Sequence, residues 1–206
     1  HDFSFAIPKD AYSRLEPLKT FTLNGTFSGF ITDFVAKGDF ECPLGKIVSD
    51  VNLKINEENV DRSSYEGNLH LIAFELGTYL KDTTMFQKVS LTGRIQGKGL
   101  TAVSADFSLA GSISSLGIRG YNYQNILTDA NFSKQFFKGF MKIDDPNLQF
   151  NASGSIDFRE GKNLVNLVGK IDTAFLKPLF HLEKNIFIQS NLDIDTKGLQ
   201  LDSLLG

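Results

Sequence analysis

The motif most suggestive of chemistry in this 206-residue sequence is Gly97-Lys98-Gly99-Leu100-Thr101-Ala102. Its glycine spacing matches the dinucleotide-binding fingerprint with alanine at the third position. That fingerprint must open a helix, because the helix N-terminus holds the pyrophosphate. Here apolar residues continue instead at every second position, at Val103, Ala105, Phe107 and Leu109. We therefore interpret the motif as a hairpin turn.

The three histidines, His1, His70 and His181, lie far apart in the sequence. None has a second histidine or a cysteine at metal-ligand spacing. His70 falls on the polar face of a strand pattern and is interpreted as a solvated residue. His181 is interpreted as a helix-end histidine.

The acidic residues and serines are equally unsuited to catalysis. Asp144-Asp145 precedes Pro146, which is typical of a turn whose short acidic side chains cap backbone N–H groups. Asp193 and Asp195 share a strand face, but no third acid or turn glycine completes a calcium loop. The serines lack a nucleophile elbow and a nearby base. We expect no catalytic residues, no metal and no cofactor, and hence no enzyme.

Composition limits the partners. With 21 basic and 24 acidic residues, the formal charge of −3 gives no basic footprint for nucleic acid. The single cysteine, Cys42, rules out an internal disulfide framework and leaves the redox compartment open. The chain has no apolar run of about 18 residues or more that could span a membrane.

The alternation of apolar and polar residues predicts β-strands along nearly the whole chain. Clear examples are Val51-Leu53-Ile55, Leu69-Leu71-Ala73 and Val165-Leu167-Gly169-Ile171. We expect roughly a dozen strands joined by short turns, which makes neighbouring strands antiparallel. Only Phe74 to Lys81 and Phe175 to Leu182 look helical, and both are short.

The chain is therefore expected to form one all-β domain over residues 1–206, excised from a longer protein. Residues 1–19 are expected to be a loose lead-in with a strand at Phe3-Phe5.

A glycine recurs in mid-strand, on the apolar face. The pattern apolar-x-Gly-x-apolar occurs seven times, for example at Leu23 to Phe27, Leu91 to Ile95 and Leu109 to Ile113. Glycine weakens a strand by about 0.5–1 kcal/mol relative to alanine. The usual reasons for it are a sharp bend in the sheet or the close approach of another body to the backbone. The glycines thus favour strong curvature of the sheet.

With no helices to cover it, the apolar face can leave water in a sandwich, a closed barrel or a curled trough. Only the trough keeps apolar surface available for an apolar ligand. An outer-membrane barrel is disfavoured, because the chain has no Trp and only 5 Tyr for aromatic girdles.

An ordered series of short motifs resembles the AsmA/TamB superfamily, in particular TamB-like translocation and assembly module proteins of Bacteroidetes. The resemblance covers roughly residues 20 to 196 and is strongest from 65 to 158. The motifs are Gly67-x-Leu69, Phe74-x-Leu76-Gly77, Val89-Ser90-Leu91-x-Gly93-x-Ile95-x-Gly97-Lys98-Gly99, Gly120-Tyr121-Asn122-Tyr123-x-Asn125-Ile126, Phe137-x-Gly139, Ile143-Asp144-Asp145-Pro146-Asn147-Leu148-x-Phe150 and Gly154-x-Ile156-Asp157-Phe158.

The resemblance implies an elongated β-taco groove in the periplasm of a Gram-negative bacterium. It further implies a full-length protein anchored in the inner membrane and associated with phospholipid transport and outer-membrane biogenesis. Neither the anchor helix nor the C-terminal domain of the family is found in this chain, so outer-membrane assembly partners belong to regions absent here.

The leading hypothesis is that phospholipid acyl chains lie along the apolar face, with neighbouring segments of the full-length protein as further partners. The lipid-binding residues would be Phe27, Leu53, Leu71, Leu91, Ile95, Phe107, Leu109, Phe150, Ile156, Leu167 and Leu192. The alternative is a non-catalytic scaffold module of the cell envelope whose β core is filled by its own side chains. A carbohydrate-binding sandwich is poorly supported, because sugar stacking typically uses Trp.

Overall fold

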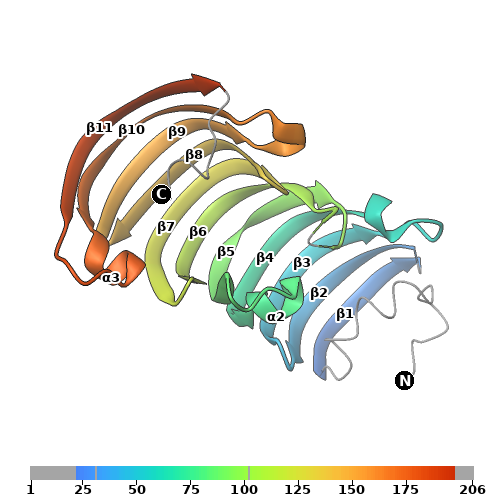
Figure 1. Cartoon of the computed structure of the whole chain (residues 1–206). Coiled ribbons are helices and arrows are strands. Elements are labelled where there is room, and N and C mark those ends of the chain that lie inside the picture. Colours follow the sequence, from blue (N-terminus) through green and yellow to red (C-terminus); the bar gives the residue numbers. More distant parts are fainter. Residues whose placement is uncertain (1–21, 31, 102, 198–206) are drawn as a thin grey trace.

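The computed structural model describes residues 22–197, apart from residues 31 and 102, as one strongly curved antiparallel sheet (Figure 1). Its eleven strands follow chain order, so each pairs with the strands before and after it. The all-β fold and the antiparallel meander are therefore confirmed. The expected lead-in, with its strand at Phe3-Phe5, lies outside the described residues. The strands are β1 (Thr22–Phe30), β2 (Asp33–Cys42), β3 (Gly45–Lys54), β4 (Ser64–Glu75), β5 (Phe86–Lys98), β6 (Asp106–Ile118), β7 (Tyr121–Ser133), β8 (Phe136–Asp145), β9 (Leu148–Asp157), β10 (Leu164–Phe175) and β11 (Phe187–Lys197).

The helices are short and lie between strands. The α-helices are α2 (Leu76–Leu80) and α3 (Leu176–Phe180), and the 3₁₀ turns are η2 (Val60–Arg62) and η3 (Arg159–Gly161). Both α-helices fall where the sequence predicts them, although Phe74 and Phe175 still belong to strands. Within residues 22–197, no helix combines the length and apolar character needed to cross a membrane.

The strand register aligns apolar residues into continuous rows across the sheet. Residues that are directly opposite in an antiparallel pair share one face. One such row, here called the isoleucine row, is apolar on every strand from β2 to β10. Its members are Phe40, Ile47, Leu71, Leu91, Ile113, Ile126, Ile143, Phe150 and Ile171.

The adjacent row on the same face, the glycine row, is made largely of small residues. It runs through Gly25, Gly38, Ser49, Leu69, Gly93, Gly111, Thr128, Met141, Ala152, Gly169 and Leu192. At its centre, a β carbon added to Gly93 would lie 3.0 Å from the Cα of Gly111 and 2.8 Å from the oxygen of Ala110. Four glycines of the recurring pattern, Gly25, Gly93, Gly111 and Gly169, lie in this row. The other three, Gly67, Gly139 and Gly154, lie in the adjacent row of the same face. The mid-strand glycines thus permit a close backbone approach along two neighbouring rows.

β-Bulges add to the bending of the strands. Register shifts occur between β4 and β5, β5 and β6, β9 and β10, and β10 and β11. In β4, Ala73 has a φ of 49° and is exposed, while Phe74 is 6% exposed. The expectation that Ala73 continues the apolar alternation is therefore wrong, because the bulge turns Phe74 inward in its place.

The segment after the glycine-lysine-glycine motif is a loop. β5 ends at Lys98 and β6 begins only at Asp106. The interpretation as a turn rather than a phosphate-binding helix start is confirmed. The prediction that the apolar alternation of a strand continues through Val103 is wrong, however, because Val103 lies in the loop with 70% of its surface exposed.

A hydrogen bond shows how far the strands curve. The Tyr79 hydroxyl of α2, before β5, donates to the Leu100 carbonyl, after β5, at 2.8 Å. A straight strand of thirteen residues would hold its ends about 40 Å apart. β5 must therefore bend back on itself, which agrees with the arched strands of Figure 1.

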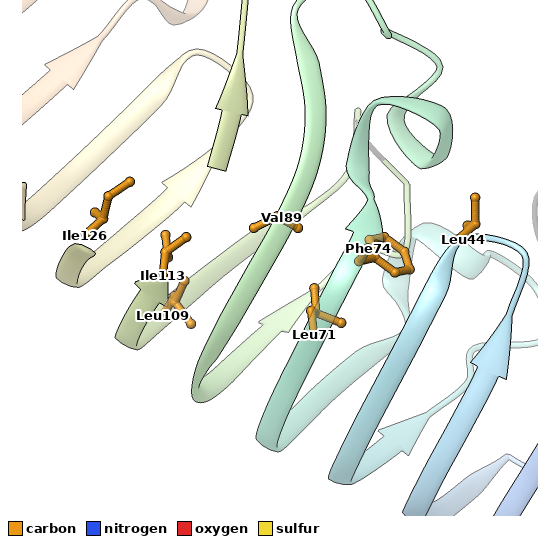
Figure 2. Close-up of a cluster of buried hydrophobic side chains, with 7 residues drawn as sticks. All are labelled: Leu44, Leu71, Phe74, Val89, Leu109, Ile113 and Ile126. Atoms are coloured by element: carbon orange, nitrogen blue, oxygen red, sulfur yellow. The ribbon is translucent and has the colours of Figure 1, made fainter. Parts of the chain in front are cut away.

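The core lies on the inner side of these bent strands (Figure 2). Its buried members come mostly from the middle of the sheet and from the turn before β3. They are Leu44, Leu71, Phe74, Val89, Leu109, Ile113 and Ile126. The apolar face is thus the concave face, a choice that the alternation alone leaves open.

Candidate functional site: the concave apolar face

The register brings ten of the eleven predicted lipid-contacting residues onto the concave face. The eleventh, Phe27, has a side chain outside the part that the structure describes. The isoleucine row holds Leu71, Leu91 and Phe150, and the glycine row holds Leu192. Two further rows of the same face hold Ile95, Leu109 and Leu167, and Leu53, Phe107 and Ile156.

Burial along this face is graded from the middle of the sheet to its ends. Among the large apolar side chains of the described strands, those that are buried all belong to β4 to β7. Leu71 and Leu109, at 9% and 6% exposure, are members of this core. The other eight predicted residues with described side chains are half-buried. The face is therefore packed in the middle and partly accessible toward both ends.

Aromatic rings line the concave face near one edge of the trough. Phe107 stacks on Phe132 with ring centroids 5.5 Å apart, and Phe132 meets Phe137 edge-on at 5.5 Å. These three residues are directly opposite one another on β6, β7 and β8. Rings in contact bury large apolar areas and hold one another in place, so this edge is rigid and apolar.

Two tyrosines place phenol groups within the apolar surroundings of β4 and α2. Burial raises the pKa of Tyr65 to about 12, with smaller contributions from Tyr79 and Asp106. Burial also raises the pKa of Tyr79. Since desolvation disfavours the phenolate, both shifts reflect a dry interior at this point.

The convex face is polar and carries ion pairs between neighbouring strands. Lys37 lies 3.4 Å from Asp50, and Lys54 lies 3.3 Å from Asp33, each directly opposite its partner. All four side chains remain substantially exposed. Such pairs contribute only about 0–1 kcal/mol each, but they keep this face solvated.

Two hollows open on the molecule away from the apolar rows. One, of about 590 Å³, lies on polar side chains of β3 to β5, including Asp50, Asn52 and Arg94. The other, of about 510 Å³, lies beside α2 and the β6–β7 hairpin, where Glu75 and Asn122 line it. The first hollow is lined mainly by polar groups, and no residue that lines the second belongs to the rows of the concave face, so the candidate lipid surface is the concave face itself.

His1 lies outside the described residues, and the other residues considered for chemistry lie where the sequence places them. His70 is exposed on β4, and His181 ends α3 in a left-handed conformation with a φ of 55°. Asp193 and Asp195 are exposed on β11. Within the described residues, no group of three or more histidine, cysteine or acidic side chains could hold a metal ion.

Asp145 has a structural role larger than the expected turn cap. Asp145 is 1% exposed. Its carboxylate accepts hydrogen bonds from the Tyr121 hydroxyl at 2.5 Å, the backbone N–H of Gln124 at 3.0 Å and the backbone N–H of Asn147 at 2.8 Å. Burial and the bond to Asp145 raise the pKa of Tyr121. The predicted cap is confirmed, and it also ties β7 to the β8–β9 turn.

Sequence reasoning missed several residues of the concave face. Leu44 follows Pro43 in what looks like a loop, yet it is 3% exposed. Ile126 and Ala130 of β7 are also buried, at 4% and 3%. Their alternation with exposed Leu127 and Asp129 could have revealed them, but Leu127 is apolar and obscures the period.

Fold and face together define a class: an all-β protein built on one strongly curved antiparallel sheet, with a concave apolar side. No family model matches the chain, and neither curated proteins nor solved structures give a match.

Proposed function

We propose that this chain binds lipid acyl chains on its concave face, as a non-catalytic periplasmic part of an AsmA/TamB-like lipid-transport protein. The observation that supports this proposal is the apolar surface that β2, β3 and β8 to β11 leave half-buried on the concave face. Exposed apolar area costs about 25 cal/mol per Å², so a bound acyl chain would lower the free energy of this surface. The headgroup would remain in water.

The continuity of the apolar rows supports an elongated ligand. The isoleucine row crosses nine strands without interruption, from Phe40 to Ile171. Neighbouring strands lie about 4.8 Å apart, so the row extends for roughly 40 Å. An acyl chain fits such a surface better than a compact ligand does.

The motif series that resembles the AsmA/TamB superfamily supports the envelope assignment. On this resemblance we base three proposals: a periplasmic location, an inner-membrane anchor in the full-length protein and a part in outer-membrane biogenesis. Neighbouring segments of that protein would extend the apolar face.

A second candidate is favoured by the middle of the sheet. There the core residues of β4 to β7 fill the bend, and the bond from Tyr79 to Leu100 joins segments at the two ends of β5. A scaffold module of the cell envelope would need such a self-filled core and no ligand.

Native mass spectrometry of the purified protein, with extraction and identification of bound lipid, tests the proposal. We expect phospholipid to be recovered with the wild-type protein. The Leu167→Asp variant should lose it, because the side chain lies on the concave face of β10. Val168→Asp is the matched control, since Val168 is 60% exposed on the opposite face.

Circular dichroism establishes that each variant is folded. Recovery of lipid-free wild-type protein, or equal lipid loss in both folded variants, would support the scaffold module instead. Ile194, directly opposite Leu167 on β11, provides a second site if Leu167→Asp does not fold.

A further inference from the structure

The loop between β10 and β11 exposes an unusual amount of apolar surface. Eleven large hydrophobic residues of the described chain are exposed, and five of them lie in the α3 loop, defined as residues 175–187. The five are Phe175 at 44%, Phe180 at 57%, Leu182 at 37%, Ile186 at 42% and Phe187 at 55%. Exposed apolar residues that gather in this way mark an interaction surface.

The α3 loop holds these side chains on a fixed support. The Leu176 amide donates to the Ile186 carbonyl at 2.9 Å, and the Leu182 amide donates to the Lys177 carbonyl at 3.1 Å. Leu179 is only 4% exposed and anchors α3. The apolar side chains are therefore displayed by an ordered segment, which lowers the entropic cost of binding.

The loop also rests on the rest of the sheet. The His181 ring lies beside the β6–β7 hairpin, where a β carbon added to Gly120 would be 3.2 Å from its Nε2 atom. The rings of Phe175 and Phe187 lie 5.4 Å apart. Phe175 and Phe187 thus form an exposed aromatic pair at the ends of β10 and β11, and the other three exposed apolar residues lie in the segment that joins these two strands.

Charge indicates what this surface meets. The loop has two lysines, Lys177 and Lys184, and one acid, Glu183, and exposed Arg119 lies in the adjoining hairpin. No ion pair within the described residues involves any of these four side chains. The surface is thus locally basic in a chain whose formal charge is −3. Anionic phosphate groups complement it.

We propose that the α3 loop docks the protein on the surface of an anionic phospholipid bilayer. The phenylalanine and aliphatic side chains enter the interface, and the lysines reach the phosphates. A protein partner fits less well, because lysine is depleted from protein–protein interfaces. This docking goes beyond the proposed binding of acyl chains on the concave face and does not require it.

Vesicle flotation with the whole chain tests the docking. Wild-type protein should float with phosphatidylcholine vesicles that contain phosphatidylglycerol, and less with phosphatidylcholine alone. Phe180→Ser should weaken binding about tenfold or more, from the loss of one inserted phenylalanine. Phe30→Ser, at an 82% exposed residue of β1, is the matched control and should bind as wild type. Lys177→Gln combined with Lys184→Gln should remove the preference for anionic vesicles.

Absence of flotation by the wild-type protein would overturn the proposal, as would equal weakening in Phe180→Ser and Phe30→Ser. Concentration-dependent dimers that Phe180→Ser abolishes, without vesicle binding, would assign the surface to a second copy instead. The two proposals fail separately. Leu167→Asp should still float, and Phe180→Ser should still retain lipid in native mass spectrometry.

Discussion

Replacing Gly111 by alanine tests the bend of the sheet at its glycine row. The new β carbon would lie 2.6 Å from the Cα of Gly93 on the neighbouring strand. Carbon atoms attract each other best at about 3.5–4.0 Å, so β5 and β6 would have to separate by about 1 Å. Overpacking of this kind costs about 1–3 kcal/mol.

The same substitution would stabilise an ordinary strand. Alanine restricts the unfolded chain and contributes about 0.4–1 kcal/mol where the native backbone accepts it. Gly111 has no positive φ, so its backbone conformation does not oppose the change. We therefore expect a net loss of about 1–2 kcal/mol in the free energy of unfolding.

Urea denaturation of the wild type and the variant measures this difference. The adjacent Ser112→Ala, at an exposed residue of the convex face, is the control and should stay within about 0.5 kcal/mol of wild type. The sign of the change in the free energy of unfolding distinguishes overpacking between β5 and β6 from the effect of alanine in an ordinary strand. A Gly111→Ala protein as stable as the wild type, or more stable, would refute the close approach of β5 and β6.

Three further predictions concern polar groups at the edges of the trough. Tyr79→Phe removes the bond to Leu100 and should cost about 0.5–1.5 kcal/mol in urea denaturation. Asp145→Asn should cost about 2–3 kcal/mol, because an amide cannot accept all three hydrogen bonds of the buried carboxylate, and Asp144→Asn at the exposed neighbouring residue should be near neutral. Burial raises the pKa of Tyr65 from 10.0 to about 12, so the folded state holds the phenol proton more tightly than the unfolded state does. The contribution of this proton to the free energy of unfolding is complete below about pH 10 and is lost as the pH rises toward 12. Denaturation across this range should therefore show a smaller alkaline loss of stability in Tyr65→Phe than in wild type.

The strands and the apolar face of the sheet could be predicted from the sequence, because both follow from the local alternation of apolar and polar residues. Leu167 and Val168 of β10 are both apolar, so their residue types alone do not assign them to a face. Only the two-residue period of the strand places them on opposite faces. The mid-strand glycines indicate curvature because glycine has a cost in a strand that some bend or close approach must justify. Their placement in two adjacent rows depends on the register of all eleven strands, which no single segment specifies.

The filling of the bend could not be predicted, because it depends on contacts between distant residues. Phe74 is buried through a bulge at Ala73 that the alternation does not signal. Tyr79 reaches Leu100 only because β5 curves back on itself. Three exposed residues of the α3 loop, Phe175, Phe180 and Leu182, fall in a segment that looks helical in the sequence, and only their exposed fractions distinguish them from residues of a core-facing helix.

The gradient of burial sets a condition on the lipid-transport proposal. An acyl chain that follows the isoleucine row from β10 toward β2 meets half-buried side chains first and then the core of β4 to β7, where Ile113 and Ile126 are 8% and 4% exposed. A lipid can pass this region only if core side chains move aside, which forfeits their packing. The α3 loop joins β10 to β11, so a protein docked through it would present the accessible end of the concave face near the bilayer. Lipid would then enter at β10 and β11, and the filled middle strands, rather than the entrance, would limit its movement along the sheet.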